Sequence, residues 1–154
     1  MYNATLIAYA FVKKGIEEGK PLTQMKLQKV VYFAEGLSLA MGNLPLVKED
    51  FQAWKYGPVI PAIYHDYKLY GSSPILDTQW VSWELDLDLS SLSVESKNTI
   101  DNTWKILQDI PGAQLSNWTH KADSPWSKHY RPGIPDIIIP KEDIKEYFMQ
   151  FKNK

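Results

Sequence analysis

The stretch PLTQMKLQKVVYFAEGLSLAMG, residues 21–42, predicts the helix around which the chain folds. Thr23 is a good N-cap, and apolar residues then recur at helical spacing. They are Leu27, Val30, Val31, Ala34, Leu37 and Met41. Because Tyr32 and Phe33 widen this apolar stripe, we expect a central helix that is buried over much of its surface and ends at Gly42.

The next informative stretch, FQAWKYGPVIPAIYHDYKLYG, covers residues 51–71. Residues 51–56 favour a short strand because aromatic residues are frequent in strands and the side chains alternate between two faces. Gly57-Pro58 is expected to end this strand. A further helix is expected to begin near Pro58 or Pro61, since proline is tolerated in the first turn of a helix.

The remaining chain adds helices and very little sheet. The spacing of apolar residues predicts helices over residues 3–18, from a Ser93 cap onward, and over residues 142–151. Residues 113–133 are expected to form one short helix and an irregular loop, in which Ser124-Pro125 has the pattern of an N-cap followed by a first-turn proline. Residues 136–139 are expected to form a short strand. The predicted fold class is mainly α, with five or six helices and a small antiparallel β-sheet or hairpin, an α+β arrangement.

The composition excludes several classes of function. The 154 residues carry 17 basic and 18 acidic side chains, so the net charge of −1 gives no overall attraction to nucleic acid. The chain has no cysteine, which excludes disulfides and thiolate metal ligands and is typical of the reducing cytoplasm. The first apolar run ends at Val12 and is too short to span a membrane, so we expect a cytoplasmic protein without a membrane partner.

No sequence motif supplies catalytic chemistry. A glycine-rich phosphate loop and a nucleophile elbow are both absent. His120, Asp123 and His129 lie in one loop and carry donor atoms that zinc uses, but they lack the spacing of a tight zinc motif. We therefore predict no catalytic residue, no metal and no cofactor.

Two features leave the mode of recognition open. The segments WTH at 118–120 and SPW at 124–126 either pin their loop to the core or present a recognition surface. Lys26 and Lys29 precede the apolar stripe of the central helix, as in the start of a DNA-reading helix. That helix is nevertheless too apolar to lie exposed in a DNA groove.

Three sequence blocks together resemble the Panacea domain, a family of phage-associated SocA-like and GepA-like antitoxins. The blocks are LTQMKLQKVVYFA at 22–34, AWKYGPVIPAIY at 53–64, and TH at 119–120 followed by Trp126. The resemblance covers nearly the whole chain and implies one Panacea-like domain over residues 1–154. The residues that carry its structural motif are Leu27, Lys29, Tyr32, Gly57, Pro58, Thr119 and His120.

The resemblance implies an antitoxin without enzymatic activity. Such domains neutralise a toxin encoded beside them by direct protein–protein binding, and in one branch they also act as adaptors that deliver the toxin to a protease. The implied partners are a cognate toxin and, in that branch, a protease. The sequence leaves open whether further copies of the chain join it in a homo-oligomer. The alternative is a DNA-binding or autoregulatory transcriptional regulator of phage origin.

Aromatic and arginine side chains are the usual anchors of protein interfaces. We therefore expect partner contacts on the strand, in the acidic segment 72–92 and in the aromatic loop. The candidates are Trp54, Tyr56, Trp80, Trp83, Trp126 and Arg131. Among them, Trp126 is the one that we expect to lie in the core instead.

Overall fold

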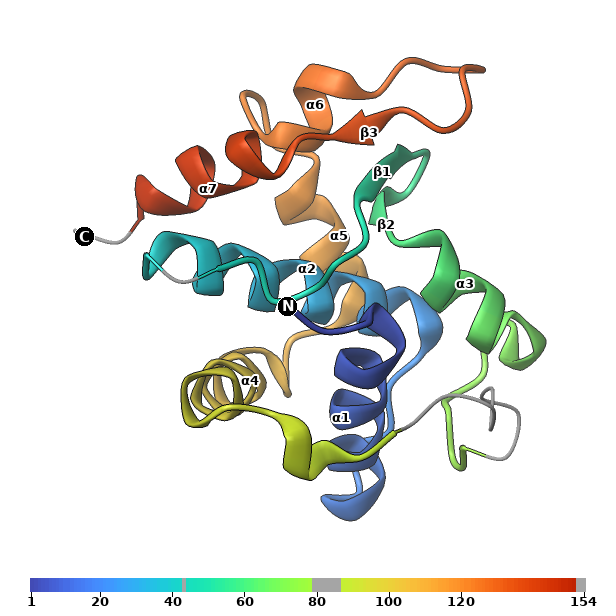
Figure 1. The fold of residues 1–154 in the computed structure, drawn as a ribbon. Coiled ribbons are helices and arrows are strands. Elements are labelled where there is room, and N and C mark those ends of the chain that lie inside the picture. Colours follow the sequence, from blue (N-terminus) through green and yellow to red (C-terminus); the bar gives the residue numbers. More distant parts are fainter. Residues whose placement is uncertain (43, 79–86, 152–154) are drawn as a thin grey trace.

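The computed structural model describes residues 1–42, 44–78 and 87–151, and it confirms a mainly α fold with a small antiparallel sheet (Figure 1). The helices in this part of the chain are α1 (Ala4–Glu17), α2 (Gln24–Ala40), α3 (Pro61–Tyr67), α4 (Val94–Leu107), α5 (Gly112–Thr119), α6 (Pro125–His129) and α7 (Lys141–Met149). The strands are β1 (Phe51–Trp54), β2 (Gly57–Val59) and β3 (Ile138–Ile139). Short 3-10 helices cover Lys68–Tyr70 and Leu89–Ser91. None of the helices described here is long and apolar enough to cross a membrane.

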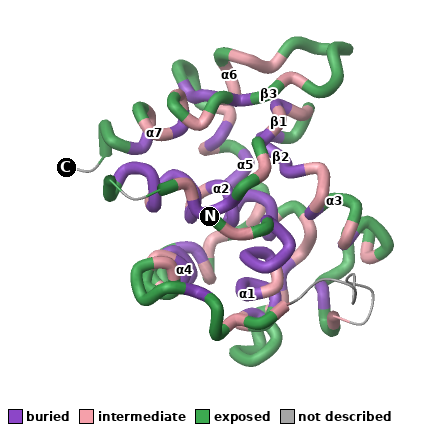
Figure 2. The backbone as a smooth tube through the Cα atoms, viewed as in Figure 1, coloured by how far each residue is buried: buried purple, intermediate pink, exposed green. Residues whose placement is uncertain are grey.

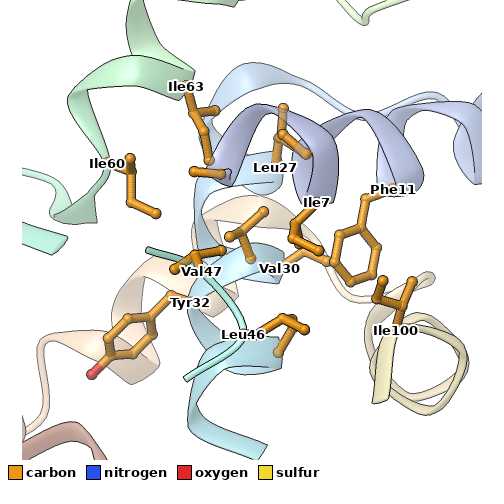
Figure 3. Packing of buried hydrophobic residues seen from close by; sticks show 14 of the residues in the cluster. Ile7, Phe11, Leu27, Val30, Tyr32, Leu46, Val47, Ile60, Ile63 and Ile100 are labelled. Carbon is orange, nitrogen blue, oxygen red and sulfur yellow. The ribbon is translucent and has the colours of Figure 1, made fainter. Parts of the chain in front are cut away.

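Helix α2 lies at the centre of the molecule and is buried along most of its length, as predicted (Figures 1 and 2). It packs against α1, α3, α4, α5, α7 and strand β2. Leu27 and Val31 are 0% exposed. Figure 3 shows the core around this helix, where its side chains meet those of α1, of the segment 46–47 and of the start of α3. Thr23 caps the helix, since its Oγ1 accepts a hydrogen bond from the Lys26 amide at 3.3 Å.

Because neighbours surround α2, two of its buried polar side chains bond to adjacent segments of the chain. The Gln28 side-chain amide donates to the Ile60 carbonyl at 3.1 Å and accepts from the Ile60 N–H at 3.0 Å. The Glu35 carboxylate accepts from the Leu46 N–H at 2.5 Å and pairs with the Lys141 ammonium. These bonds fix three segments against α2: the approach to β1, the approach to α3, and the start of α7.

The segment after β1 differs from the prediction. The sequence favours a strand over residues 51–56 that leads directly into a helix, whereas β1 ends at Trp54, turns through Lys55-Tyr56, and pairs antiparallel with β2. Gly57 permits this return because its φ is 121°, a value that other residues rarely adopt. Pro58 fits because β2 is an edge strand in a sheet of order β2-β1-β3, where a missing N–H is tolerated.

Residues 112–129 form two short helices where the sequence predicts one helix and a loop, which brings the described helices to seven. Asp123, at φ 67°, separates α5 from α6. Ser124 then caps α6 by accepting a hydrogen bond from the Ser127 N–H at 3.1 Å, and Pro125 occupies the first turn. The Ser-Pro pair was expected to start a helix, and this detail is confirmed.

Helix α2 presents no basic face to DNA. Lys29 is buried, and Lys26 donates from Nζ to the Gln108 carbonyl at 2.6 Å. A DNA-reading helix needs an exposed surface that can enter a groove. Lys29 therefore lies in the interior, and Lys26 is bonded to the residue that follows α4.

Burial of Leu27 predicts a large effect of truncation on stability. Leu27→Ala is expected to lower the free energy of unfolding by about 2–5 kcal/mol, because the lost apolar contacts leave a cavity in the core. Met25→Ala is the matched control on the same helix, since Met25 is 43% exposed, and it is expected to change stability by less than about 0.5 kcal/mol. Urea denaturation measures both. Equal effects of the two substitutions would contradict the central position of α2.

Candidate functional site

Three consecutive backbone carbonyls at the tip of the β1–β2 hairpin lie within hydrogen-bond distance of side chains from α5, its C-cap and α6. The pairs are Trp126 Nε1 with Trp54 O at 2.6 Å, His120 Nε2 with Lys55 O at 3.2 Å, and Ser116 Oγ with Tyr56 O at 2.8 Å. We refer to Ser116, His120 and Trp126 as the hairpin clamp. A turn exposed to solvent is ordinarily among the more mobile parts of a fold. The clamp therefore holds this tip in one conformation.

The side chains of the clamp are themselves fixed by their neighbours. The His120 Nδ1 atom lies 2.6 Å from the Ser116 carbonyl, so both ring nitrogens face backbone oxygens. A neutral imidazole donates from one of these nitrogens, and a protonated one from both. The Trp126 ring packs against two others, with centroid distances of 3.9 Å to His120 and 4.6 Å to Tyr130. Ring packing and hydrogen bonds thus orient the same residues.

Gly57 lies at the closest approach between the hairpin and the rest of the fold. A Cβ atom at this position would lie 2.7 Å from Lys29 Cε and 2.9 Å from Thr119 Oγ1. The Thr119 hydroxyl donates to the Ser116 carbonyl at 2.7 Å, which keeps it in place. The structure thus brings Lys29, Gly57 and Thr119 into contact, although they come from three separate blocks of the sequence.

Lys29 carries a buried positive charge. Its side chain is 1% exposed, and burial lowers the pKa of the ammonium group to about 8. No hydrogen bond or ion pair joins it to any residue that the structure describes. It is therefore mostly protonated at pH 7 at a cost in folding free energy.

An open groove of about 690 Å³ runs beside the hairpin. Its walls come from the first turn of α2, the hairpin, α3 and the start of α5. They include the aromatic side chains Trp54, Tyr56 and Tyr64, with Lys29 among the lining residues. The rings of Trp54 and Tyr64 meet edge to face at a centroid distance of 5.2 Å. The groove is thus aromatic, and its buried charge is positive.

Two of the three histidines, His120 and His129, are engaged within the fold. His129 Nε2 lies 2.6 Å from Asp143 Oδ2, and the ring nitrogens of His120 face the carbonyls of Ser116 and Lys55. In the described part of the chain, no three histidine or acidic side chains gather as a set that could hold a metal ion. Asp123, the third member of the zinc set considered from the sequence, lies exposed at the turn between α5 and α6.

Residues 27–127 match the family described as antitoxin SocA-like, Panacea domain. The chain belongs to this family. The matched residues extend from the body of α2 to α6, and so include Lys29, the hairpin and all three side chains of the clamp. The sequence resemblance to the Panacea domain is thereby confirmed.

A similar protein is the antitoxin SocA of Caulobacter vibrioides (strain NA1000 / CB15N). It is 35% identical to this chain over 75 residues, which are 49% of this chain and 40% of the relative. The likeness therefore spans less than half of the relative's length. No solved structure matches the chain.

The partner-contact candidates occupy different positions in this Panacea domain. Tyr56 is 62% exposed at the hairpin tip, and Trp54 is half-buried in the groove wall. Arg131 is exposed and donates to the Tyr130 carbonyl at 2.8 Å. Trp126 is half-buried against the core, where it serves the clamp. Trp80 and Trp83 lie outside the described residues.

Sequence reasoning missed two residues of the site. Ser116 supplies one bond of the clamp, and Gln24 lines the groove. The spacing of Ser116 and His120, one helical turn apart, is a signal that could have linked them. Nothing in the sequence pairs Ser116 with Tyr56, which is 60 positions away.

The close approach at Gly57 predicts an effect of a side chain there. Gly57→Val is expected to lower the melting temperature strongly, because it combines a clash with Lys29 and Thr119 and backbone strain of about 1–3 kcal/mol. Gly19→Val is the matched control, since Gly19 also has a positive φ but open space around its α-carbon. Equal losses in the two variants would show that the close approach contributes nothing beyond strain.

The buried charge of Lys29 predicts a pH-dependent stability. Between about pH 8 and the ordinary lysine pKa of 10.5, the unfolded chain holds a proton on Lys29 that the folded chain has lost, so this group raises stability as pH rises. Lys29→Met removes the buried charge and is expected to stabilise the fold at pH 7 by on the order of 3 kcal/mol. The gain should shrink from pH 8 to pH 10.

Denaturant titrations at several pH values measure this difference. Lys105→Met on α4 is the control, because Lys105 is exposed, and it is expected to show neither the gain nor its pH dependence. A Lys29→Met variant that is less stable than the wild type at pH 7 would mean that the ammonium has a stabilising partner in the fold.

Proposed function

We propose that this Panacea domain is an antitoxin that neutralises a toxin encoded next to it by direct protein–protein binding, with no catalytic step. The observation that carries the proposal is the hairpin clamp. It fixes the backbone at residues 54–56 and leaves the side chains of Lys55 and Tyr56 exposed. A surface that is already ordered loses little entropy on binding, which favours affinity.

The chemistry of this surface also suits a protein partner. Tyr56 is a large amphipathic side chain of the kind that dominates interface energetics. The Lys55 ammonium lies 5.5 Å from the centre of the Tyr56 ring, so the tip combines an aromatic face with a positive charge. Trp54 continues the aromatic surface into the groove.

The arrangement of polar groups favours binding over catalysis. The Thr119 hydroxyl lies 3.3 Å from His120 Nδ1, a contact that resembles a nucleophile beside a base. Thr119 is buried, however, and its hydroxyl donates to the Ser116 carbonyl. A nucleophile needs an accessible oxygen whose proton the base can take. Both residues support the hairpin instead.

The proposal predicts that Tyr56→Ala loses partner binding without losing stability. We expect the dissociation constant for the neighbouring gene product to rise about tenfold or more, and growth protection in co-expression to fall, because Tyr56 is an exposed anchor. Its melting temperature should match that of the wild type. Val94→Ala on α4, also an exposed apolar residue, is the control and should keep full protection.

The outcomes separate the alternatives. If the wild type does not bind the product of the neighbouring gene and instead represses its own promoter, a DNA-binding regulator is the better account. If the wild type binds and the toxin also disappears from cells in a protease-dependent way, the antitoxin acts as an adaptor. If Tyr56→Ala binds like the wild type, the hairpin tip is not the contact surface.

A further inference from the structure

The groove beside the hairpin holds a positive charge without a counter-ion. Lys29 lines it and pairs with no described residue, and Lys55 stands at its rim as a second lysine. None of the described residues that line the groove is an aspartate or a glutamate. A buried ion is ordinarily paired. The groove thus holds a buried cation without the anion that would ordinarily accompany it.

Two helix N-termini add to this positive potential. The cap and first two residues of α2, and the first two residues of α5, line the same groove. Amides in a first turn have no carbonyl partner within the helix, and the aligned peptide dipoles give that end a partial positive charge. The groove therefore attracts an anionic group through backbone N–H groups as well as through Lys29.

The groove also contains a hydrogen-bond acceptor without a donor. Gln24 is one of the lining residues, and its buried Oε1 atom has no hydrogen-bond partner among the residues that the structure describes. An amide oxygen in this position is satisfied by an N–H group of a ligand. The aromatic side chains of Trp54, Tyr56 and Tyr64 supply apolar walls between these polar groups. A ligand that fits thus combines a negative charge, an N–H donor and apolar surface.

We propose that this groove binds an acidic peptide segment of the partner protein, whose carboxylate pairs with the Lys29 ammonium and whose backbone N–H donates to Gln24 Oε1. The inference rests on the proposed function, in which that partner is the toxin. A peptide fits better than a nucleic acid. Nucleic-acid affinity grows with the number of phosphates that are neutralised, and the groove offers two lysines in a chain of net charge −1.

Binding of a carboxylate would also explain why the fold retains a destabilising charge. In the free protein, burial lowers the pKa of Lys29 to about 8. A carboxylate beside the ammonium favours the charged form and raises that pKa again. The charge that weakens the free domain then contributes to the complex, which is a trade of stability for function.

The experiment compares the wild type with Lys29→Met by calorimetric titration with the purified product of the neighbouring gene. Methionine matches the lysine side chain as far as the ε-carbon and lacks the charged ammonium. We expect the dissociation constant to rise by about 30-fold or more, because the partner's carboxylate loses its counter-ion. The wild-type affinity should also weaken as pH rises above 8, whereas the Lys29→Met affinity should be flat there. Lys105→Met on α4 is the control and should bind like the wild type at every pH.

Failure of the inference is distinct from failure of the proposed function. If the wild type does not bind the gene product at all, direct neutralisation is wrong. If the wild type binds and Lys29→Met binds equally well with the same pH profile, the function stands and the carboxylate site is overturned. If a labelled DNA duplex or single-stranded RNA displaces the gene product from the wild type and has no affinity for Lys29→Met, the anion is a phosphate and the peptide assignment is overturned. A melting curve for each variant confirms that the comparison is between folded proteins.

Discussion

The fold depends on the burial of α2, which neighbours surround, so that a polar side chain on its buried surface is costly unless it finds a partner inside the protein. Gln28 holds both polar groups of the Ile60 backbone, and Glu35 holds the Leu46 amide and the Lys141 ammonium. These bonds determine where the chain enters and leaves the sheet. The helix thus fixes the positions of the adjoining loops through hydrogen bonds, in addition to forming the core.

Lys29 departs from that pattern, as does Gln24 Oε1. Lys29 lines the groove beside the hairpin, and its ammonium has no partner among the described residues. The same lysine side chain packs against Gly57 and so supports the turn. Lys29 therefore supports the hairpin turn with its aliphatic chain and gives the groove its positive charge.

The sequence predicts those features that are decided locally. The stripe around Leu27 and the caps at Thr23, Ser93 and Ser124 depend on neighbours in the chain, and all are found. The β2 strand could not be predicted in this way. Pro58 is acceptable there because β3, which comes from residue 138 onward, pairs with β1 and leaves β2 at the edge of the sheet. The clamp likewise joins residues that are 60 to 72 positions apart, as in the bond from Trp126 to Trp54.

The clamp has a consequence for how such a domain can diversify. It grips the hairpin through carbonyl oxygens, which every amino acid provides, and it makes no demand on the side chains at positions 55 and 56. Substitutions at these two positions leave all three hydrogen bonds available. The backbone that holds the hairpin is therefore independent of the side chains that the hairpin exposes. Evolution can change the exposed surface at positions 55 and 56 without changing the contacts that stabilise the fold.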